Sequence, residues 1–189
     1  MYCLIVRKPM SEDIQLIEEF LRGNESAFNK LVVKYSKKVY FLALRLLGEH
    51  YDAEEASQEA FIKVHKSLKG LKEKKYFFTW LYRITYNVCM SQKKNVKYSE
   101  SLETAAEVQD QKAEYYMEKM KQDQLKEHVK VLMEELPKQQ KAVFVMRIYE
   151  NMKFEEISEV MGLSTGGVKS SFFNAVQKIK CGVKEKYEL

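Results

Sequence analysis

The stretch that decides the fold is Phe154-Glu-Glu-Ile-Ser-Glu-Val-Met-Gly-Leu-Ser-Thr-Gly-Gly-Val-Lys-Ser-Ser-Phe-Phe-Asn-Ala175. It predicts two helices joined by a tight turn at Gly162, because glycine readily takes the left-handed backbone that such a turn requires. Ser158, one turn earlier, is small enough to let the second helix pack closely across the first. Ser164 or Thr165 caps the second helix. The residues that this pattern places inward are Ile157, Met161, Leu163, Val168 and Phe172.

The opposite face of the predicted second helix is available to a partner. It carries Lys169, Ser170, Phe173, Asn174 and Gln177. An asparagine can pair bidentately with adenine and a phenylalanine can contact a thymine methyl, so this face suits the major groove of duplex DNA. Phe172 and Phe173 cannot both face inward, which favours a role for the outer ring. An ordinary helical hairpin, and a helix-turn-helix that contacts only protein, remain as alternatives.

The composition of the whole chain favours helices. Its 189 residues include only seven glycines and two prolines, the residues on which the turns of sheets usually depend. Hydrophobic residues make up 46% and charged residues 31%, as expected of a folded protein rather than a disordered one. We therefore predict an all-α protein with two small helical domains joined by a flexible acidic linker.

Apolar residues spaced three and four apart predict four helices before the linker. The second is a long core helix with Phe28, Leu31, Tyr35, Val39, Leu42 and Leu46 in step. The third buries Ala56, Ala60, Val64 and Leu68, and the fourth runs from about Tyr76 to Lys94. The expected boundary residues are Ser11 as cap of the first helix, Gly23 and Asn24 before the second, Gly48 at its end, Asp52 with Glu55 as a capping box of the third, and Gly70 at its close.

The second half follows a segment of different composition. From about Asn95 to Gln122 the chain is acidic and weakly periodic, which predicts a flexible linker with some fraying helix. Helical order is expected to resume near Gln124, and Pro137 suits the first turn of the next helix. The inner face of that helix is marked by Ala142, Val143, Met146 and Tyr149. The predicted domains are residues 11–97 and 123–187, with the linker at 98–122.

Charge is distributed in blocks, although the net charge is only +5. Basic residues dominate from 66 to 98 and again from 165 to 186, while acids dominate from 99 to 119. Two basic blocks predict two surfaces for a polyanion, with solvated faces as the alternative. The third predicted helix differs, because its face of Glu54, Glu55, Gln58, Glu59 and Ile62 is largely acidic. An acidic face indicates a protein partner rather than DNA, again with a solvated face as the alternative.

A basic and aromatic stretch runs from Leu71 to Asn87. It interleaves cations with Tyr76, Phe77, Phe78, Trp80 and Tyr82, and Tyr86 follows. Such a surface suits single-stranded DNA, because bases stack on the rings while cations hold the backbone. The alternative is that the rings form hydrophobic core, and only some of them can do so.

Several classes of function find no support in the sequence. The three cysteines and three histidines are scattered, so neither a disulfide framework nor a metal site is predicted. Paired carboxylates in an apolar setting, a nucleophile beside a base, and a phosphate-binding glycine loop are all missing. We therefore expect no cofactor and no catalysis, and a helical enzyme is the least favoured alternative. Without an apolar run of about 18 residues or a signal-peptide pattern, a cytoplasmic protein is expected.

In their order and spacing, these pieces resemble the extracytoplasmic-function sigma factors, the small two-domain group of the sigma-70 family. The resemblance runs from about Ser11 to Lys186. Its strongest pieces are Asp52-Ala-Glu-Glu-Ala-Ser-Gln-Glu-Ala-Phe61, Phe77-Phe-Thr-Trp-Leu-Tyr-Arg-Ile-Thr-Tyr-Asn87, and Leu136-Pro137 followed by the helix-turn-helix. It implies a non-catalytic initiation factor that binds core RNA polymerase, directs it to promoter DNA and helps to melt the −10 element.

The resemblance also implies where the partners bind. The clamp helices of the polymerase would dock on Glu54, Glu55, Gln58 and Glu59. The −10 element would be bound by Lys72, Lys74, Lys75, Tyr76, Phe77, Trp80, Arg83 and Asn87, and the −35 element by Thr165, Lys169, Ser170, Phe173 and Asn174. The linker would thread toward the polymerase active-site channel. An anti-sigma factor would be sandwiched between the two domains or wrapped around them.

The chain departs from the family pattern at a few positions. The family usually has Asp at the position of Ser91, Arg near Lys94, a basic residue at Phe78, and Arg at Ser171 and Asn174. Fewer cations at the last two positions predict weak, salt-sensitive DNA binding by the second domain alone. A stand-alone regulator that binds duplex DNA and never contacts polymerase remains the rival function. Co-purification with polymerase separates the two, and charge reversal at Glu55 and Glu59 abolishes activity only in a sigma factor.

Overall fold

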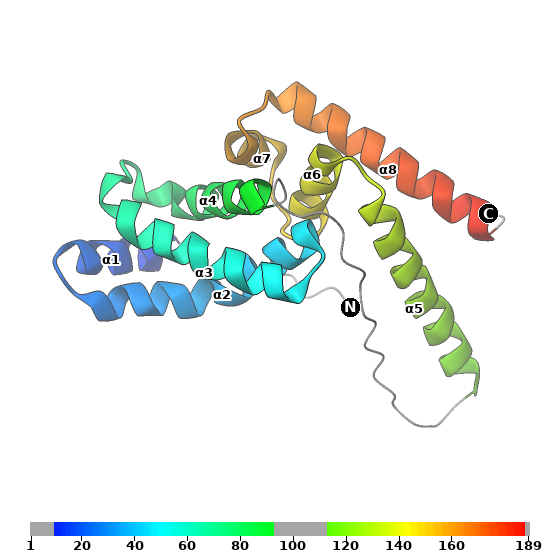
Figure 1. Cartoon of the computed structure of the whole chain (residues 1–189), viewed down its shortest axis with the longest axis horizontal. Helices are drawn as coiled ribbons and strands as arrows, with labels where there is room; N and C mark the ends of the chain where they lie inside the picture. The colour runs from blue at the N-terminus through cyan, green and yellow to red at the C-terminus, as the bar shows by residue number, and fades with distance from the viewer. Residues whose placement is uncertain (1–9, 93–112, 188–189) are drawn as a thin grey trace. The chain divides into compact units, whose positions relative to one another are not determined.

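The computed structural model describes residues 10–92 and 113–187, and within these ranges the regular structure is helical throughout (Figure 1). The first compact unit contains α1 (Met10–Leu21), α2 (Glu25–Leu47), α3 (His50–Ser67) and α4 (Phe77–Gln92), with short 3-10 turns η1 (Leu68–Gly70) and η2 (Lys74–Tyr76) before α4. The second contains α5 (Ala113–Glu134), α6 (Lys138–Ile148), most of α7 (Phe154–Met161), and α8 (Thr165–Tyr187). The all-α prediction with two helical units is confirmed.

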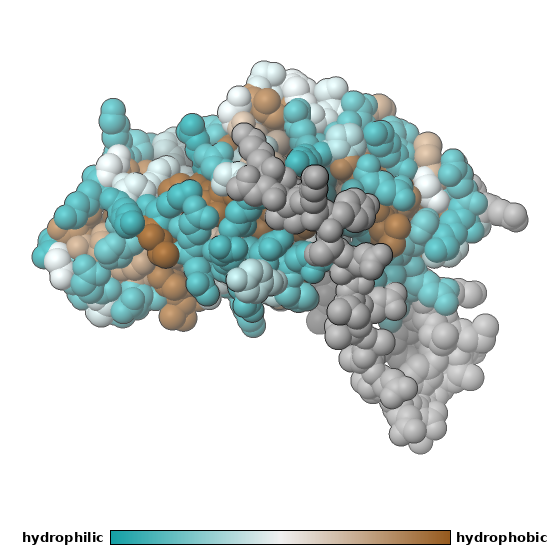
Figure 2. Space-filling model, viewed as in Figure 1, coloured by the Kyte–Doolittle hydropathy of each residue, from teal (hydrophilic) through white to brown (hydrophobic). Residues whose placement is uncertain are grey.

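The core of the first unit is built around α2, which packs against α1, α3 and α4. Its neighbour α3 presents Ala53, Ala56 and Ala60, all fully buried, and these small side chains allow close helix packing. Larger apolar side chains fill the remaining space, namely Ile17, Leu31, Val39, Leu42, Leu46, Val64, Leu68, Phe77, Leu81 and Tyr82. In Figure 2 the surface over this unit is mainly hydrophilic, with brown patches where apolar side chains are exposed. The buried faces of α2 and α3 agree with the predicted periodicity.

The turns around α2 form where the sequence predicts them. Gly23 takes a φ of 101° after α1, and the Asn24 side chain accepts a hydrogen bond from the Ser26 backbone N–H at 3.2 Å. At the other end Gly48 is left-handed with a φ of 95°, and its N–H donates to the Leu44 carbonyl at 2.8 Å. Glycine adopts such backbone angles without steric cost, so Gly23 ends α1 and Gly48 ends α2 without strain.

Two predicted helix starts are wrong. The helix α1 already includes Met10, so Ser11 lies in its first turn rather than at its cap. The helix α3 begins at His50 with Glu49 as its N-cap, and the Ala53 N–H donates to the Glu49 carbonyl at 3.0 Å. Asp52 and its expected partner therefore lie within the first turns and form no capping box. An acid at Asp52 still suits the positive end of the helix dipole, which explains why the pattern misled.

The helix α1 is fixed to α2 by a partly buried polar cluster. The Tyr35 hydroxyl donates to Asp13 Oδ2 at 2.6 Å, and Lys34 Nζ donates to Asp13 Oδ1 at 2.6 Å and to Glu12 at 2.8 Å. Burial opposes the charge on Lys34, but its hydrogen bonds to the two acids outweigh this and raise its pKa. Burial and the hydrogen bond to Asp13 raise the pKa of Tyr35 well above its ordinary value. The cluster ties the N-terminal helix to the core.

The second unit departs from prediction in three places. The helix α5 begins at Ala113, so helical structure starts well before Gln124. Pro137 is the N-cap of α6 rather than part of its first turn. On α6, Ala142, Val143 and Met146 are buried as expected, but Tyr149 is 41% exposed. The prediction of a flexible linker at 98–122 falls partly on residues 98–112, which lie outside the described residues, and partly on the first turns of α5.

Candidate nucleic-acid and protein interfaces

The two helices α7 and α8 form the predicted helix-turn-helix. Gly162 ends α7 in the left-handed region with a φ of 68°, and its N–H is bonded to the Ser158 carbonyl. Leu163 N–H donates to the same carbonyl at 3.1 Å. Ser164 then caps α8, since its hydroxyl accepts from the Gly167 N–H at 3.1 Å. The choice left open between Ser164 and the next residue is thus settled in favour of Ser164, and Thr165 is the first residue of α8.

The inner side of α8 is held by apolar and aromatic packing. Val168 is fully buried, as is Ile157 on α7, while Met161 and Leu163 are half-buried. The Phe172 ring lies 5.5 Å from the Phe154 ring and 6.2 Å from the Phe144 ring, measured between centroids. The inward positions predicted for α7, α8 and the turn between them are therefore confirmed.

The outer side of α8 is exposed at the positions expected to meet DNA. Lys169, Ser170, Phe173, Asn174 and Gln177 are all exposed, and Phe173 keeps 61% of its surface accessible. Lys169 Nζ lies 5.9 Å from the centroid of the Phe154 ring, whose centroid is 5.0 Å from the Arg147 guanidinium. Thr165 is half-buried, with its hydroxyl 3.4 Å from that of Ser158. The ring of Phe154 thus lies close to Lys169, the cation of the outer face.

Ser171 does not belong to this outer face. It is 8% exposed, and its hydroxyl accepts a hydrogen bond from Gln139 Nε2 of α6 at 3.0 Å. A side chain turned toward α6 cannot act as a phosphate anchor in this conformation. Of the two positions where the resembled family usually has Arg, only Asn174 therefore lies on the exposed face of α8.

The segment before α4 is basic, but its lysines are not equivalent. Lys74 Nζ donates to Glu18 of α1 at 2.9 Å, and this hydrogen bond lowers the pKa of Glu18. Lys75 is paired with Glu73 at 3.3 Å, a contact that raises the pKa of Lys75, and its Nζ lies 4.9 Å from the centroid of the exposed Tyr76 ring. Lys72 is exposed and makes no ion pair within the described residues. Of the three, Lys72 is the most available to a polyanion.

The aromatic residues of α4 divide between core and surface. Phe77 is 2% exposed and Tyr82 is fully buried, so the prediction that Phe77 binds DNA does not fit its position. Its ring lies 5.7 Å from the Tyr35 ring and is needed to close the core around α2. Trp80 is half-buried, and Arg83 and Asn87 are exposed on the same helix. Of the residues predicted to bind single-stranded DNA, Lys74 is already paired, and those that remain exposed or half-buried are Lys72, Lys75, Tyr76, Trp80, Arg83 and Asn87.

The acidic face of α3 is exposed as predicted. Glu54, Glu55 and Gln58 are exposed, and the two acids form no ion pair within the described part of the first unit. Glu59 is half-buried and paired with Lys63 at 2.7 Å. Ile62 is 53% exposed beside them. An exposed apolar side chain at the edge of free carboxylates is consistent with a protein partner that carries cations around an apolar contact.

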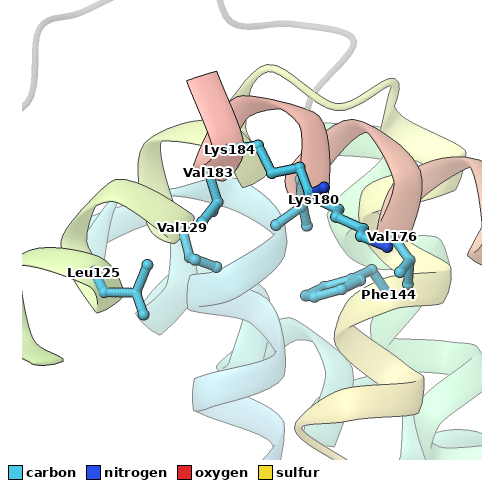
Figure 3. Close-up of a pocket in the computed structure, with 8 residues that line it drawn as sticks. Leu125, Val129, Phe144, Val176, Lys180, Val183 and Lys184 are labelled. Atoms are coloured by element: carbon cyan, nitrogen blue, oxygen red, sulfur yellow. The ribbon is translucent and has the colours of Figure 1, made fainter. Parts of the chain in front are cut away.

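The second unit also has an apolar groove of about 470 Å³ between α5, α6 and α8. Figure 3 shows Leu125 and Val129 of α5 and Phe144 of α6 with side chains of α8 around this space. Its lining is completed by Val176, Ile179, Lys180, Val183 and Lys184. The lysine ammonium groups are its only charged groups, so the groove offers an apolar surface rather than a polar reaction site.

Two further properties concern the residues that the structure describes. Across residues 10–92 and 113–187, His, Cys, Asp and Glu side chains nowhere gather in a group of three suited to a metal ion. In the same ranges, no helix combines the length and apolar character needed to cross a membrane.

Comparison with known proteins identifies both units. Residues 31–97 match the family described as Sigma-70 region 2, and residues 127–179 match Sigma-70, region 4. The chain is 29% identical to the RNA polymerase sigma-H factor of Pseudomonas aeruginosa, over 89% of this chain and 92% of that protein. It is also 29% identical to the ECF RNA polymerase sigma-E factor of Escherichia coli strain K12, over 90% of this chain and 95% of that protein.

Two solved structures share the fold. One is CnrH in complex with the cytosolic domain of CnrY, with a TM-score of 0.70, 19% identity, and coverage of 93% of this chain and 99% of that chain. The other is the sigma factor RpoE in complex with the anti-sigma factor NepR from Bartonella quintana, with a TM-score of 0.66, 16% identity, and coverage of 83% and 96%.

Proposed function

This chain belongs to the sigma-70 family as an extracytoplasmic-function sigma factor, and we propose that its two units grip a promoter at two points while α3 holds the polymerase. A sigma factor directs RNA polymerase to specific promoters and is an initiation factor rather than an enzyme. The assignment of polymerase and −10 binding to the first unit and −35 binding to the second rests on the order of the two matched regions, with exposed acids in the first and a helix-turn-helix in the second. We assign residues 11–97 and 123–187 to these tasks, with 98–122 between them.

The polymerase contact is proposed to lie on α3, at Glu54, Glu55, Gln58 and Glu59. Glu54 and Glu55 are exposed carboxylates without an intramolecular ion pair in the described residues, so docking a basic partner does not require breaking one. Glu59 shares its carboxylate with Lys63, so its contribution should be smaller. The exposed Ile62 supplies the apolar part of the contact.

The −10 element is proposed to bind the exposed basic and aromatic surface that precedes and includes α4. Tyr76 is 49% exposed with the Lys75 ammonium over its ring, which suits a stacked base with a nearby phosphate. Lys72, Trp80, Arg83 and Asn87 complete this surface. Melting requires no chemistry, because bases flipped into protein contacts offset the lost stacking. Phe77 is left out of the proposal, because it is core.

The −35 element is proposed to be read by the outer face of α8 in the major groove. Ser170, Phe173 and Asn174 lie in its N-terminal half, the part of a recognition helix that reaches base edges. Lys169 lies on the same face and is proposed to contact a phosphate, and Thr165 lies at the start of the same helix.

The chain is proposed to act in the cytoplasm, where core polymerase and promoter DNA are found, and to be held inactive by an anti-sigma factor. Two proteins of the same fold were solved in complexes, one with an anti-sigma factor named NepR and one with the cytosolic domain of CnrY. An inhibitor that covers α3 would block polymerase docking, one that covers α8 would block the −35 contact, and one that spans both units would block both.

The test of the whole proposal is transcription by core polymerase with and without the full chain. Start-site mapping on fragments of the host genome should show a discrete set of new promoters that depend on the chain. No change in polymerase occupancy or in start sites would refute the proposed function.

The stand-alone regulator is separated from the sigma factor by charge reversal on α3. Replacing Glu54 and Glu55 together by lysine should abolish co-purification with core polymerase and chain-dependent transcription, since cations then face a basic partner. The matched control is Glu135→Lys, an exposed acid of the second unit outside the proposed contacts. If the double variant still drives transcription at the level of the control, α3 is not the docking face.

A further inference from the structure

The outer face of α8 carries a side-chain pair whose chemistry points to particular bases. Phe173 is 61% exposed, and across the described residues its ring contacts no other aromatic ring. Phe172, its neighbour, is the one that fills the aromatic cluster with Phe144 and Phe154. Packing therefore does not account for a phenylalanine at 173, because the inward position next to it already supplies the ring that the core uses.

The side chain of Asn174 is similarly uncommitted. It is exposed, and within the described part of α5–α8 it makes no hydrogen bond. Its amide carries an acceptor oxygen and a donor NH₂ side by side. That pair matches the N6 donor and N7 acceptor of adenine in the major groove, whereas guanine presents two acceptors there. An asparagine thus favours adenine, and it cannot satisfy guanine with both groups.

The positions of the two residues allow them to act on neighbouring bases. Consecutive helical residues are separated by about 100° around the axis, so they can reach adjacent pairs or opposite strands. Ser170 lies one turn before Asn174 on the same face and can bond to any base, so it adds little discrimination. Lys169 is the only cation from Thr165 to Gln177, which leaves the base contacts a large share of the selectivity.

We propose that Asn174 and Phe173 select an A·T-rich step in the −35 element, with Asn174 reading an adenine through its amide and Phe173 packing on the methyl group of an adjacent thymine. The inference rests on the proposed function of α8 as the −35 reader and adds the identity of the bases. Discrimination by one bidentate contact is about five- to 150-fold. Loss of one buried methyl group corresponds to about a fourfold loss of affinity.

The experiment is selection of promoter duplexes with a randomised −35 element by holoenzyme assembled from core polymerase and the full chain, followed by sequencing. Wild type should enrich adenine at one position of the element. Asn174→Arg should convert that position to guanine, changing the adenine-to-guanine ratio at least about tenfold, because arginine donates twice to guanine. Gln124→Arg is the matched control, since it adds the same charge at an exposed position of α5, outside the proposed DNA-binding face, and should leave that position of the element unchanged.

Phe173 is tested by replacing thymine with uracil in the selected element, which removes only the methyl group. Uracil should weaken the binding of wild-type holoenzyme about fourfold. It should leave the binding of the Phe173→Ala holoenzyme unchanged, because that variant has no ring in contact with the methyl group. Because Phe173 is an exposed side chain, this substitution is not expected to disturb folding.

The outcomes separate this inference from the proposed function. The base assignments alone are overturned if wild type selects a defined element but Asn174→Arg leaves its preferred base unchanged. They are also overturned if uracil weakens wild type and Phe173→Ala equally. Failure of wild-type holoenzyme to select any −35 sequence refutes the proposed function of α8 and the inference with it.

Discussion

Asp13→Ala tests whether the polar cluster between α1 and α2 stabilises the first unit. Asp13 is 9% exposed and accepts hydrogen bonds from the Tyr35 hydroxyl and the Lys34 ammonium, both at 2.6 Å. The substitution removes both acceptor oxygens. It therefore isolates the energetic role of one carboxylate in attaching α1.

The magnitude follows from the environment of the two donors. The Tyr35 hydroxyl is left buried without its partner, which costs about 1–3 kcal/mol. Lys34 is one-third exposed and keeps its contact with Glu12, so its loss is limited to about 0.5–1 kcal/mol. Together the free energy of unfolding of the first unit should fall by about 1.5–4 kcal/mol. Because Glu18 on the same helix holds Lys74, loosening α1 also releases the segment proposed to bind the −10 element.

The chain offers a clean probe for this unit. Its single tryptophan, Trp80, lies half-buried on α4 with its ring 6.1 Å from the Phe77 ring. Urea unfolding of the full chain followed by tryptophan fluorescence therefore reports on the first unit and not on the second. The control is Glu12→Ala, which removes an exposed partner of the same lysine and should cost less than about 1 kcal/mol. Equal unfolding free energies for Asp13→Ala and Glu12→Ala would refute the reasoning.

Three other predictions concern pH, backbone and salt. The raised pKa of Tyr35 means that the folded state holds the phenolic proton more tightly than the unfolded state, so this contribution to stability is complete below pH 10 and is lost as the pH rises above it. Urea unfolding at increasing pH should show a smaller loss of stability for Tyr35→Phe than for wild type, and an equal loss in both proteins would contradict this prediction. Gly162→Ala should lower the free energy of unfolding by about 1–2 kcal/mol because φ at Gly162 is 68°, whereas Gly166→Ala should not destabilise, because an added Cβ there meets nothing within 4 Å. Thermal unfolding followed by circular dichroism measures both variants, and equal melting temperatures would argue against strain at the turn. Lys72→Ala should reduce the slope of log affinity against log salt concentration by about 0.7 for holoenzyme binding to a −10 single strand, and Lys74→Ala should reduce it by less because Lys74 is already paired with Glu18. Fluorescence anisotropy over a salt series measures both slopes, and identical slopes for the two variants would contradict the difference between the lysines.

Periodicity and turn chemistry predicted most of the fold because they depend on local sequence. Gly48 and Gly162 end their helices in the left-handed region as expected, and Asn24 caps α2. Cap residues were less reliable where several candidates were available. Asp52 and Glu55 have the spacing of a capping box, but α3 begins one turn earlier, and an acid in the first turn is favourable in either register.

The candidate site was predicted in its elements but not in the state of each side chain. Phe77 is surrounded by lysines and aromatics in the sequence, so composition alone groups it with the DNA-binding surface. Only tertiary packing shows that its ring closes the core against Tyr35. Ser171 is a similar case, because its hydroxyl is taken up by Gln139 of another helix. Pairing between distant residues, such as Lys74 with Glu18, leaves no local signal in the sequence.

The scarcity of cations between Thr165 and Gln177, in the first half of α8, has a consequence for how the two units work together. With Lys169 as the one phosphate contact proposed from this stretch, beside a few proposed base contacts, we expect the second unit to have little affinity of its own for DNA. Attachment to polymerase through the first unit changes this, because a tethered domain meets its site at an effective concentration on the order of millimolar. A −35 contact with a Kd on the order of millimolar is then about half occupied in the holoenzyme, although it is invisible for the free chain. Weak recognition by α8 therefore makes promoter choice depend on polymerase, so any partner that removes α3 from polymerase also removes the chain from its −35 element.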